Sequence, residues 1–317
     1  YVYPRDLHSF PTRRSSDLPE MNGIQFVEKL MQTTPCPVLV MSSTVSSDPQ
    51  KIFQIIESGA LDFVAKPSHD SDFEARQFIQ KIVLISKVAV CKRHPLKKRE
   101  GKTGQKPPLS VPAPKGVPVI KMVAIGASTG GPQALEIVLK KLPEDFPVPI
   151  LCVQHITLGF LPGMIEWLSS RCKLKIKIAQ SGEFPRPATV YFPEEKTHLE
   201  VSPEGRLVSS FKPPIGGHRP SITLTFQTMA DCYKHRSMGI LLTGMGRDGA
   251  EGMKHIADSG GITIAQDEKT SVVFSMPKEA ISLGSVGYVL PIHQIPFTLT
   301  ELLSMDTKKN TRRRYDR

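Results

Sequence analysis

Short, continuously apolar runs alternate with amphipathic stretches along most of this chain. Between residues 119 and about 304, the apolar runs predict seven strands, at 119–125, 148–154, 174–178, 189–193, 237–243, 262–265 and 286–290. The stretches between them predict helices near 132–141, 160–171, 221–233, 249–259 and 277–282, and a hairpin over 198–210. Strands that are apolar at every position are typical of a parallel sheet covered by helices on both faces. The pattern therefore predicts a doubly wound, mostly parallel α/β domain over 119–304.

A shorter series of the same kind precedes this domain. It predicts helices and strands in alternation, at 24–32, 37–42, 49–58, 61–66 and 72–90. Two strands are too few for a covered parallel sheet, so we interpret residues 19–90 as part of a domain. Residues 91–118 are rich in Lys, Pro and Gly and lack any period, which predicts a basic linker. We expect residues 1–18, which also lack periodicity, to be foreign to the fold.

The net charge of +11 lies mainly in the linker and at the two ends of the chain. Residues 85–118 carry nine Lys or Arg against one Glu, and the basic tail at 305–317 carries six against two acidic residues. The rest of the chain is close to neutral, and the basic runs lack interleaved aromatic side chains. We therefore expect no dedicated nucleic-acid site.

The apolar runs and the cysteines bear on where the protein works. No run reaches the roughly 18 residues that a membrane helix needs, and the first residues do not form a signal peptide. The five cysteines are odd in number and scattered, which is typical of reduced thiols. We expect a cytoplasmic protein without membrane insertion.

Three reactive side chains follow three of the predicted strands. Ser128 lies just past the first strand, His155 directly follows the second, and Asp248 lies just past the fifth. Each has a structural explanation when taken alone: a turn, a buried histidine and a helix N-cap. Together they form the set that acyl transfer needs, because His accepts the serine proton and Asp fixes the tautomer of the histidine. We predict a Ser-His-Asp catalytic triad.

The segment around Ser128 also fits the pattern G-x-S-x-G, a sharp strand-to-helix turn that exposes a nucleophile. We expect its glycines to allow a strained backbone. Free backbone N–H groups at the start of the following helix would face a developing oxyanion. Thr129 is the first candidate donor, and Met245 or Gly246 in the second glycine-rich loop is the next.

Two other chemistries compete for these loops. Residues 126–131 partly fit the dinucleotide-binding frame G-x-G-x-x-G, but Ser128 replaces the middle glycine, where a pyrophosphate must approach the backbone. His155 also stands where an acidic residue would hold a ribose. Metal hydrolysis lacks support because the histidines are scattered and no H-E-x-x-H or Cys/His cluster is present. We expect His198, in the predicted hairpin, to lie at the surface.

Five segments in the second domain resemble the signature segments of the chemotaxis protein-glutamate methylesterase (CheB) family. They occur in the family's order and spacing: GASTGGP at 126–132, VQH at 153–155, GHRPS at 217–221, LLTGMGRDGAEGM at 241–253 and AQDEKTSVVFSMPKEAI at 265–281. The resemblance places the family's triad on Ser128, His155 and Asp248. Ser275 departs from it, because the family usually has glycine there; we expect this serine to tighten its loop without abolishing chemistry.

Residues 19–90 resemble the back half of a flavodoxin-like response-regulator receiver domain. The segment PEMNG at 19–23 resembles the loop after a phospho-accepting aspartate. Ser42 matches the switch hydroxyl, Phe63 the switch aromatic, and Lys66, before a proline, the receiver lysine.

The same resemblance predicts that the phosphorylation site is missing. The acceptor aspartate would stand at position 15, which is Ser15, and Asp17 is out of register. In the family, Mg²⁺ supports phosphorylation and is held by an acidic pair, which would belong to the first half of the receiver and is missing here.

The resemblance implies hydrolysis of glutamate methyl esters on the cytoplasmic helices of methyl-accepting chemoreceptors, with release of methanol, and deamidation of receptor glutamines. The esterase needs no cofactor or metal, and the family is regulated by a chemotaxis histidine kinase. We also expect Arg219 and residues 265–276 to line the cleft. Two alternatives stay open: a receptor-binding regulator without catalysis, and a general esterase of small substrates.

Overall fold

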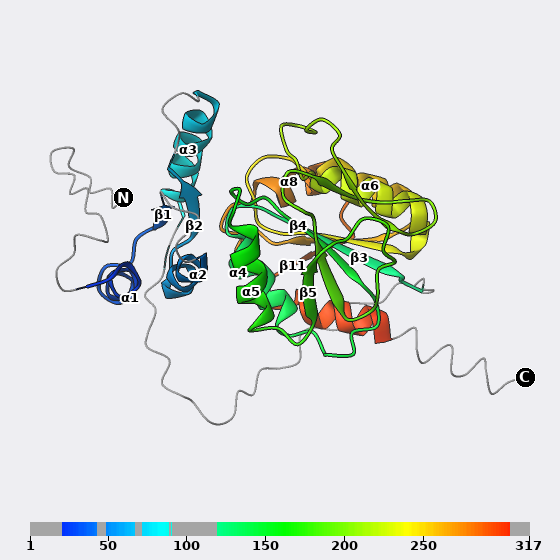
Figure 1. Ribbon diagram of the computed structural model, residues 1–317, viewed down its shortest axis with the longest axis horizontal. Helices are drawn as coiled ribbons and strands as arrows, with labels where there is room; N and C mark the ends of the chain where they lie inside the picture. The colour runs from blue at the N-terminus through cyan, green and yellow to red at the C-terminus, as the bar shows by residue number, and fades with distance from the viewer. Residues whose placement is uncertain (1–20, 43–48, 67–71, 89, 91–118, 305–317) are drawn as a thin grey trace, which may run out of the picture. The chain divides into compact units, whose positions relative to one another are not determined.

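The computed structural model describes residues 21–42, 49–66, 72–88, 90 and 119–304 (Figure 1). The chain divides into two compact units, and the division falls inside the 91–118 segment. The predicted linker, residues 1–18 and the basic tail lie outside the described residues.

The first unit pairs two parallel strands with three helices. Strands β1 (Leu39–Ser42) and β2 (Asp62–Ala65) lie in parallel register, with helices α1 (Gly23–Thr33), α2 (Pro49–Ser58) and α3 (Asp72–Ile85). Asn22 begins α1 with a capping box, in which its side chain and that of Gln25 bond each other's backbone N–H. Helix α3 ends five residues before the predicted end.

The second unit is built on a seven-stranded sheet whose paired neighbours are all parallel. The strand order is β11-β10-β9-β3-β4-β6-β5. The strands are β3 (Met122–Ala127), β4 (Ile150–Gln154), β5 (Lys175–Ile178), β6 (Thr189–Phe192), β9 (Ser237–Leu241), β10 (Ile262–Gln266) and β11 (Tyr288–Leu290). Every position of β3, β4, β9 and β10 is buried. The predicted α/β class is confirmed.

Helices cover both faces of this sheet. Helices α4 (Gly131–Leu139) and α5 (Leu161–Ser169) lie on one side in Figure 1. Helices α6 (Ile222–Tyr233), α7 (Ala250–Asp258) and α8 (Ser275–Ser282) lie on the other, where α7 packs against both α6 and α8. A short 3-10 turn, η2 (Lys234–Arg236), follows α6. A further helix at residues 295–304 was not predicted.

The predicted hairpin is confirmed as an antiparallel pair beside the main sheet. It consists of β7 (His198–Val201) and β8 (Leu207–Ser210), and β7 packs on α6.

The strand order reverses around β3, because β4 lies on one side of it and β9 on the other. The register pairs Ala127 with Gln154 and Gly126 with Leu241, so the carboxyl ends of the three strands lie level. In an open α/β sheet, the crevice at such a switch point is where ligands bind.

Candidate active site

Ser128 lies at this switch point of the sheet, one residue past β3. Its backbone N–H donates to the Thr243 carbonyl at 3.0 Å, and its own carbonyl accepts the Gly131 N–H at 2.8 Å. Gly130 then adopts a left-handed φ of 74°, which a side chain would disfavour, and the chain turns into α4. The sharp turn after the strand matches the prediction from G-x-S-x-G.

His155 and Asp248 contact each other directly. His155 Nε2 lies 2.9 Å from Asp248 Oδ2, and the His155 N–H donates to the Ala127 carbonyl at 3.0 Å, next to Ser128. The other ring nitrogen, Nδ1, is buried and has no hydrogen-bond partner within the described chain. The Ser128 hydroxyl makes no hydrogen bond to any described residue, which is common in unliganded sites because catalytic bonds tighten when substrate binds.

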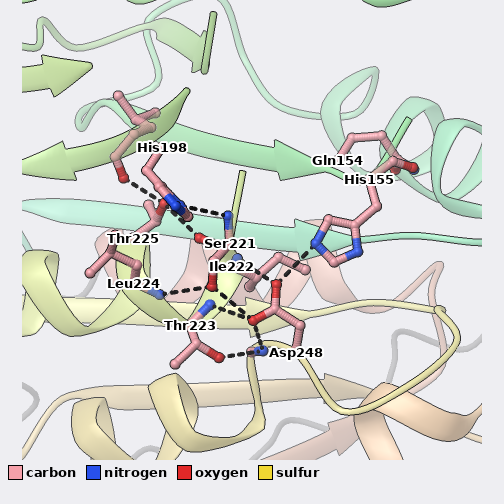
Figure 2. Close-up of polar contacts among 11 residues, drawn as sticks. Gln154, His155, His198, Ser221, Ile222, Thr223, Leu224, Thr225 and Asp248 are labelled. Carbon is pink, nitrogen blue, oxygen red and sulfur yellow. Dashed lines mark hydrogen bonds and ion pairs between the residues drawn. The ribbon is translucent and has the colours of Figure 1, made fainter. Parts of the chain in front are cut away.

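The Asp248 carboxylate is held by the amino-terminal end of α6 (Figure 2). Its Oδ1 accepts the Ser221 hydroxyl and the N–H groups of Thr223 and Gly249, each at 3.0 Å. Its Oδ2 accepts the Ile222 N–H at 2.7 Å in addition to His155. Free N–H groups at a helix start are a favourable site for a negative charge.

The pKa of Asp248 reflects this environment. Burial alone would raise its pKa, but the hydrogen bond and charge of His155, with the hydrogen bonds from Thr223 and Ile222, lower it well below the ordinary value. The carboxylate is therefore ionised at neutral pH and favours the tautomer that carries the proton on Nε2 of His155. The unpartnered Nδ1 is then the basic atom of the ring.

Close packing by two glycines brings α6 to this position. A Cβ on Gly126 would lie 2.3 Å from Ile222 Cγ2, and a Cβ on Gly249 would lie 2.8 Å from the same atom. Of the two glycines in G-x-S-x-G, Gly130 has the positive φ that was expected, whereas Gly126 does not. It is small so that the first residue of α6 can reach β3.

The predicted oxyanion donors lie around Ser128. The backbone N–H groups of Thr129, Met245 and Gly246 make no hydrogen bond within the described residues. The Gly244 backbone is close to the nucleophile, since a Cβ there would lie 2.8 Å from Ser128 Cβ. Their role in binding an oxyanion stays a prediction.

His218 was missed by the sequence analysis, although it lies in one of the signature segments. Its ring stacks on that of His155 with centroids 4.1 Å apart and planes 4° apart. Burial, and then the charge of His155, lower the pKa of His218 to about 4 against the opposing effect of Asp248. His218 is therefore neutral at pH 7 and packs as a flat surface against the catalytic ring.

His198 is buried, so the expectation that it lies at the surface is wrong. Its Nδ1 accepts the Ser221 N–H at 3.1 Å, and its Nε2 lies 3.2 Å from the Pro213 carbonyl. Every position of β7 is buried because this strand packs on α6. His198 thus supports the residue that caps α6 and donates to Asp248.

Two other residues singled out in the sequence are Arg219, just before α6, and Ser275, the first residue of α8. Arg219 is exposed, and its guanidinium lies 3.4 Å from the carbonyl oxygens of Phe211 and Lys212. The hydroxyl of Ser275 donates to the Gly246 carbonyl at 2.9 Å, which ties the start of α8 to the loop before Asp248. The cleft role of Arg219 and residues 265–276 stays a prediction.

The receiver-like residues lie in the first unit. Ser42 is the last residue of β1, Phe63 is buried in β2 with its ring edge-on to Phe53 at 5.5 Å, and Lys66 follows β2 at the surface. The acceptor position, with Ser15 and Asp17, lies outside the described residues.

The described residues offer neither a metal cluster nor a membrane-spanning helix. Within them, no group of three or more His, Cys, Asp or Glu side chains could hold a metal ion. No helix among them is long and apolar enough to cross a membrane.

Comparison with known proteins points to one family. Residues 123–299 match the family model described as CheB methylesterase. The chain is 38% identical to a protein-glutamate methylesterase/protein-glutamine glutaminase of Nitrosospira multiformis, over 90% of this chain and 82% of the relative. It is 40% identical to a protein of the same name from Anaeromyxobacter dehalogenans, over 90% and 81%. The crystal structure of the Thermotoga maritima CheB methylesterase catalytic domain aligns with a TM-score of 0.56 at 39% identity, over 58% of this chain and 98% of that one.

Proposed function

This chain belongs to the CheB methylesterase family, and we propose that it hydrolyses γ-glutamyl methyl esters on the cytoplasmic helices of chemoreceptors. We extend the proposal to deamidation of receptor glutamines, because the relatives' name includes glutaminase. The observation that carries it is the 2.9 Å contact between His155 and Asp248 beside Ser128 at the switch point of the sheet. Substrates on cytoplasmic helices imply that the protein works in the cytoplasm.

The proposed reaction begins with attack of Ser128 Oγ on the ester carbonyl. The serine proton passes to Nδ1 of His155, because Nε2 is bonded to Asp248. The tetrahedral oxyanion is met by the free N–H of Thr129 and by one N–H from the Met245–Gly246 loop. His155 then protonates the departing methoxide, and methanol leaves an acyl-enzyme.

The second half of the reaction releases the glutamate product from the acyl-enzyme. Water attacks the acyl-enzyme and gives its proton to His155, and the glutamate carboxylate leaves as Ser128 is protonated again. With a glutamine substrate the first leaving group is ammonia. Asp248 stays ionised throughout and stabilises the imidazolium, as its five hydrogen bonds favour. This route uses only groups of the chain and calls for no cofactor.

The test is methanol release from methylated chemoreceptor membranes by the full chain, compared with Ser128→Ala. We expect a loss of about 10³-fold or more when the nucleophile is removed. Ser170→Ala is a matched control, because this exposed serine caps the far end of α5. Equal release by wild type and Ser128→Ala would contradict the triad.

Two further outcomes would select the alternatives. Turnover of p-nitrophenyl acetate without turnover of methylated receptor would favour a general esterase. Binding to receptor membranes, with neither turnover nor labelling of Ser128 by a fluorophosphonate probe, would favour a regulator without catalysis.

A further inference from the structure

Gln154 connects the backbones of the nucleophile and the base. It is the last residue of β4, and its side chain is buried. Its Nε2 donates to the Ser128 carbonyl and to the His155 carbonyl, both at 2.8 Å. Ser128 and Gln154 are 26 residues apart in the sequence, so one amide group joins two loops that come from different strands.

The orientation of this amide is set by its surroundings. Turning it over would place Oε1 against two carbonyl oxygens, so the NH₂ group must face Ser128 and His155. Oε1 is then buried without a hydrogen-bond partner among the described residues. The unpaired acceptor disfavours the folded state and offsets part of what the two donated bonds contribute; methionine would remove the unpaired oxygen but also leave the His155 carbonyl without this donor. The net contribution of this amide to stability is therefore smaller than its two hydrogen bonds alone would suggest.

Gly131 accommodates the unpaired oxygen. A Cβ on Gly131 would lie 1.9 Å from Gln154 Oε1, so only glycine fits beside this amide. The Gly131 N–H also donates to the Ser128 carbonyl at 2.8 Å. Two donors thus hold one carbonyl oxygen of the nucleophile's residue.

The consequence follows from the planarity of the peptide bond. The Ser128 carbonyl and the Thr129 N–H belong to one peptide group and point in opposite directions in its trans form. Fixing the carbonyl with Gln154 therefore fixes the direction of the Thr129 N–H, which makes no hydrogen bond within the described chain. The second bond of the same amide holds the backbone of His155.

We propose that Gln154 is a positioning residue that aims the Thr129 N–H at the oxyanion and holds the Ser128 and His155 backbones in register. The inference rests on the proposed esterase function. Gln154 acts through the backbone, since its side chain is buried and does not touch the reacting atoms.

The first test is Gln154→Met in the full chain, with steady-state hydrolysis of p-nitrophenyl acetate and thermal unfolding. We expect kcat to fall about 10- to 100-fold, less than the loss of a whole oxyanion donor, with KM within about twofold. The melting temperature should change little, because the loss of the two donated bonds is offset in part by removal of the unpaired oxygen. Gln180→Met is the control, since this glutamine is exposed and bonds Glu183 through its backbone N–H and carbonyl rather than through its side chain.

Gln154→Glu tests the donor itself. Its carboxylate has the same shape but cannot donate, whereas its protonated form regains one donor. The ratio of its activity to that of wild type should therefore rise as pH falls. Unchanged kcat in Gln154→Met, or a lower melting temperature with unchanged kcat, would overturn the proposal.

The design separates this inference from the proposed function. A wild type that turns over p-nitrophenyl acetate but not receptor esters would refute the substrate and leave the role of Gln154 to be decided on the small ester. A wild type that neither turns over the small ester nor labels with a fluorophosphonate would overturn the triad and the role of Gln154 together.

Discussion

Replacing Asp248 with asparagine tests how the carboxylate organises this site. The carboxylate accepts five hydrogen bonds, three at Oδ1 and two at Oδ2. Asparagine keeps one acceptor oxygen and places an NH₂ group at the other position. At Oδ1 that group would face the fixed N–H groups of Thr223 and Gly249. At Oδ2 it would face the Ile222 N–H and His155, whose tautomer can change, so the Oδ2 position is favoured.

The magnitude follows from that orientation. One buried donor, the Ile222 N–H, loses its acceptor, and the bonds that remain lose their negative charge. An unpaired buried group costs about 1–3 kcal/mol, and a bond to a charged group is worth about 1.5–3 kcal/mol, so we expect a loss of stability of about 2–4 kcal/mol. The amide hydrogen facing Nε2 moves the ring proton of His155 to Nδ1. The base is then lost, and kcat should fall about 10³- to 10⁴-fold.

The assay compares kcat/KM for p-nitrophenyl acetate with denaturant unfolding of the second unit in the full chain. Asp258→Asn is the matched control, because this carboxylate lies at the surface on α7 and, among the described residues, its ion pair is with Lys254, four residues before it. We expect that control to change stability by less than about 0.5 kcal/mol and activity not at all.

Two results would refute this reasoning. If Asp248→Asn kept more than about a tenth of the wild-type activity, the charge would not be needed to set the tautomer of His155. If it lost activity without loss of stability, the contacts with α6 would not be the interactions that the geometry indicates.

Two other predictions follow from the packing and the charges of the site. Gly244→Ala would place a Cβ 2.2 Å from Met276 Sδ and 2.8 Å from Ser128 Cβ, so we expect kcat to fall about 10- to 100-fold as the nucleophile shifts. Gly182→Ala is its control, because this glycine follows the edge strand β5 and nothing lies within 4 Å of a Cβ there; its φ of +88° should reduce stability by about 1–2 kcal/mol, and kcat measured with p-nitrophenyl acetate should stay close to wild type. The folded pKa of His218 is about 4, below its ordinary 6.5, so the unfolded chain takes up this proton first as pH falls. Stability that is fully present above about pH 6.5 is therefore lost between pH 6.5 and 4, and His218→Gln should flatten that part of the melting-temperature profile; an unchanged slope would refute it.

The arrangement of the second unit could be predicted because the patterns that indicate its strands lie within short stretches of the sequence. Continuous apolar runs mark strands that are buried on both faces, and the residue after each run lies at the edge of the sheet. Ser128, His155 and Asp248 could be identified in this way before their contacts were known. The helix at 295–304 was missed although its buried side chains recur at helical spacing.

The errors at Gly126 and His198 share a cause, since each residue has neighbours that are distant in sequence. The turn chemistry of glycine accounts for Gly130 but not for Gly126, whose small size instead admits Ile222 from α6, about a hundred residues later. His198 was placed at the surface because a hairpin read alone has no partner, whereas α6 covers this one.

The sequence by itself determined the class of fold, the order of the elements and the three side chains that end at one edge of the sheet, because these follow from short-range periodicity and strand direction. Only the tertiary structure decided which nitrogen of His155 contacts Asp248, and that the start of α6 stabilises the negative charge of that carboxylate. It also decided that Gln154 joins two loops. These are contacts between segments far apart in the chain, with geometry set by how α6 and β4 pack against β3. No local pattern of residues encodes such distances.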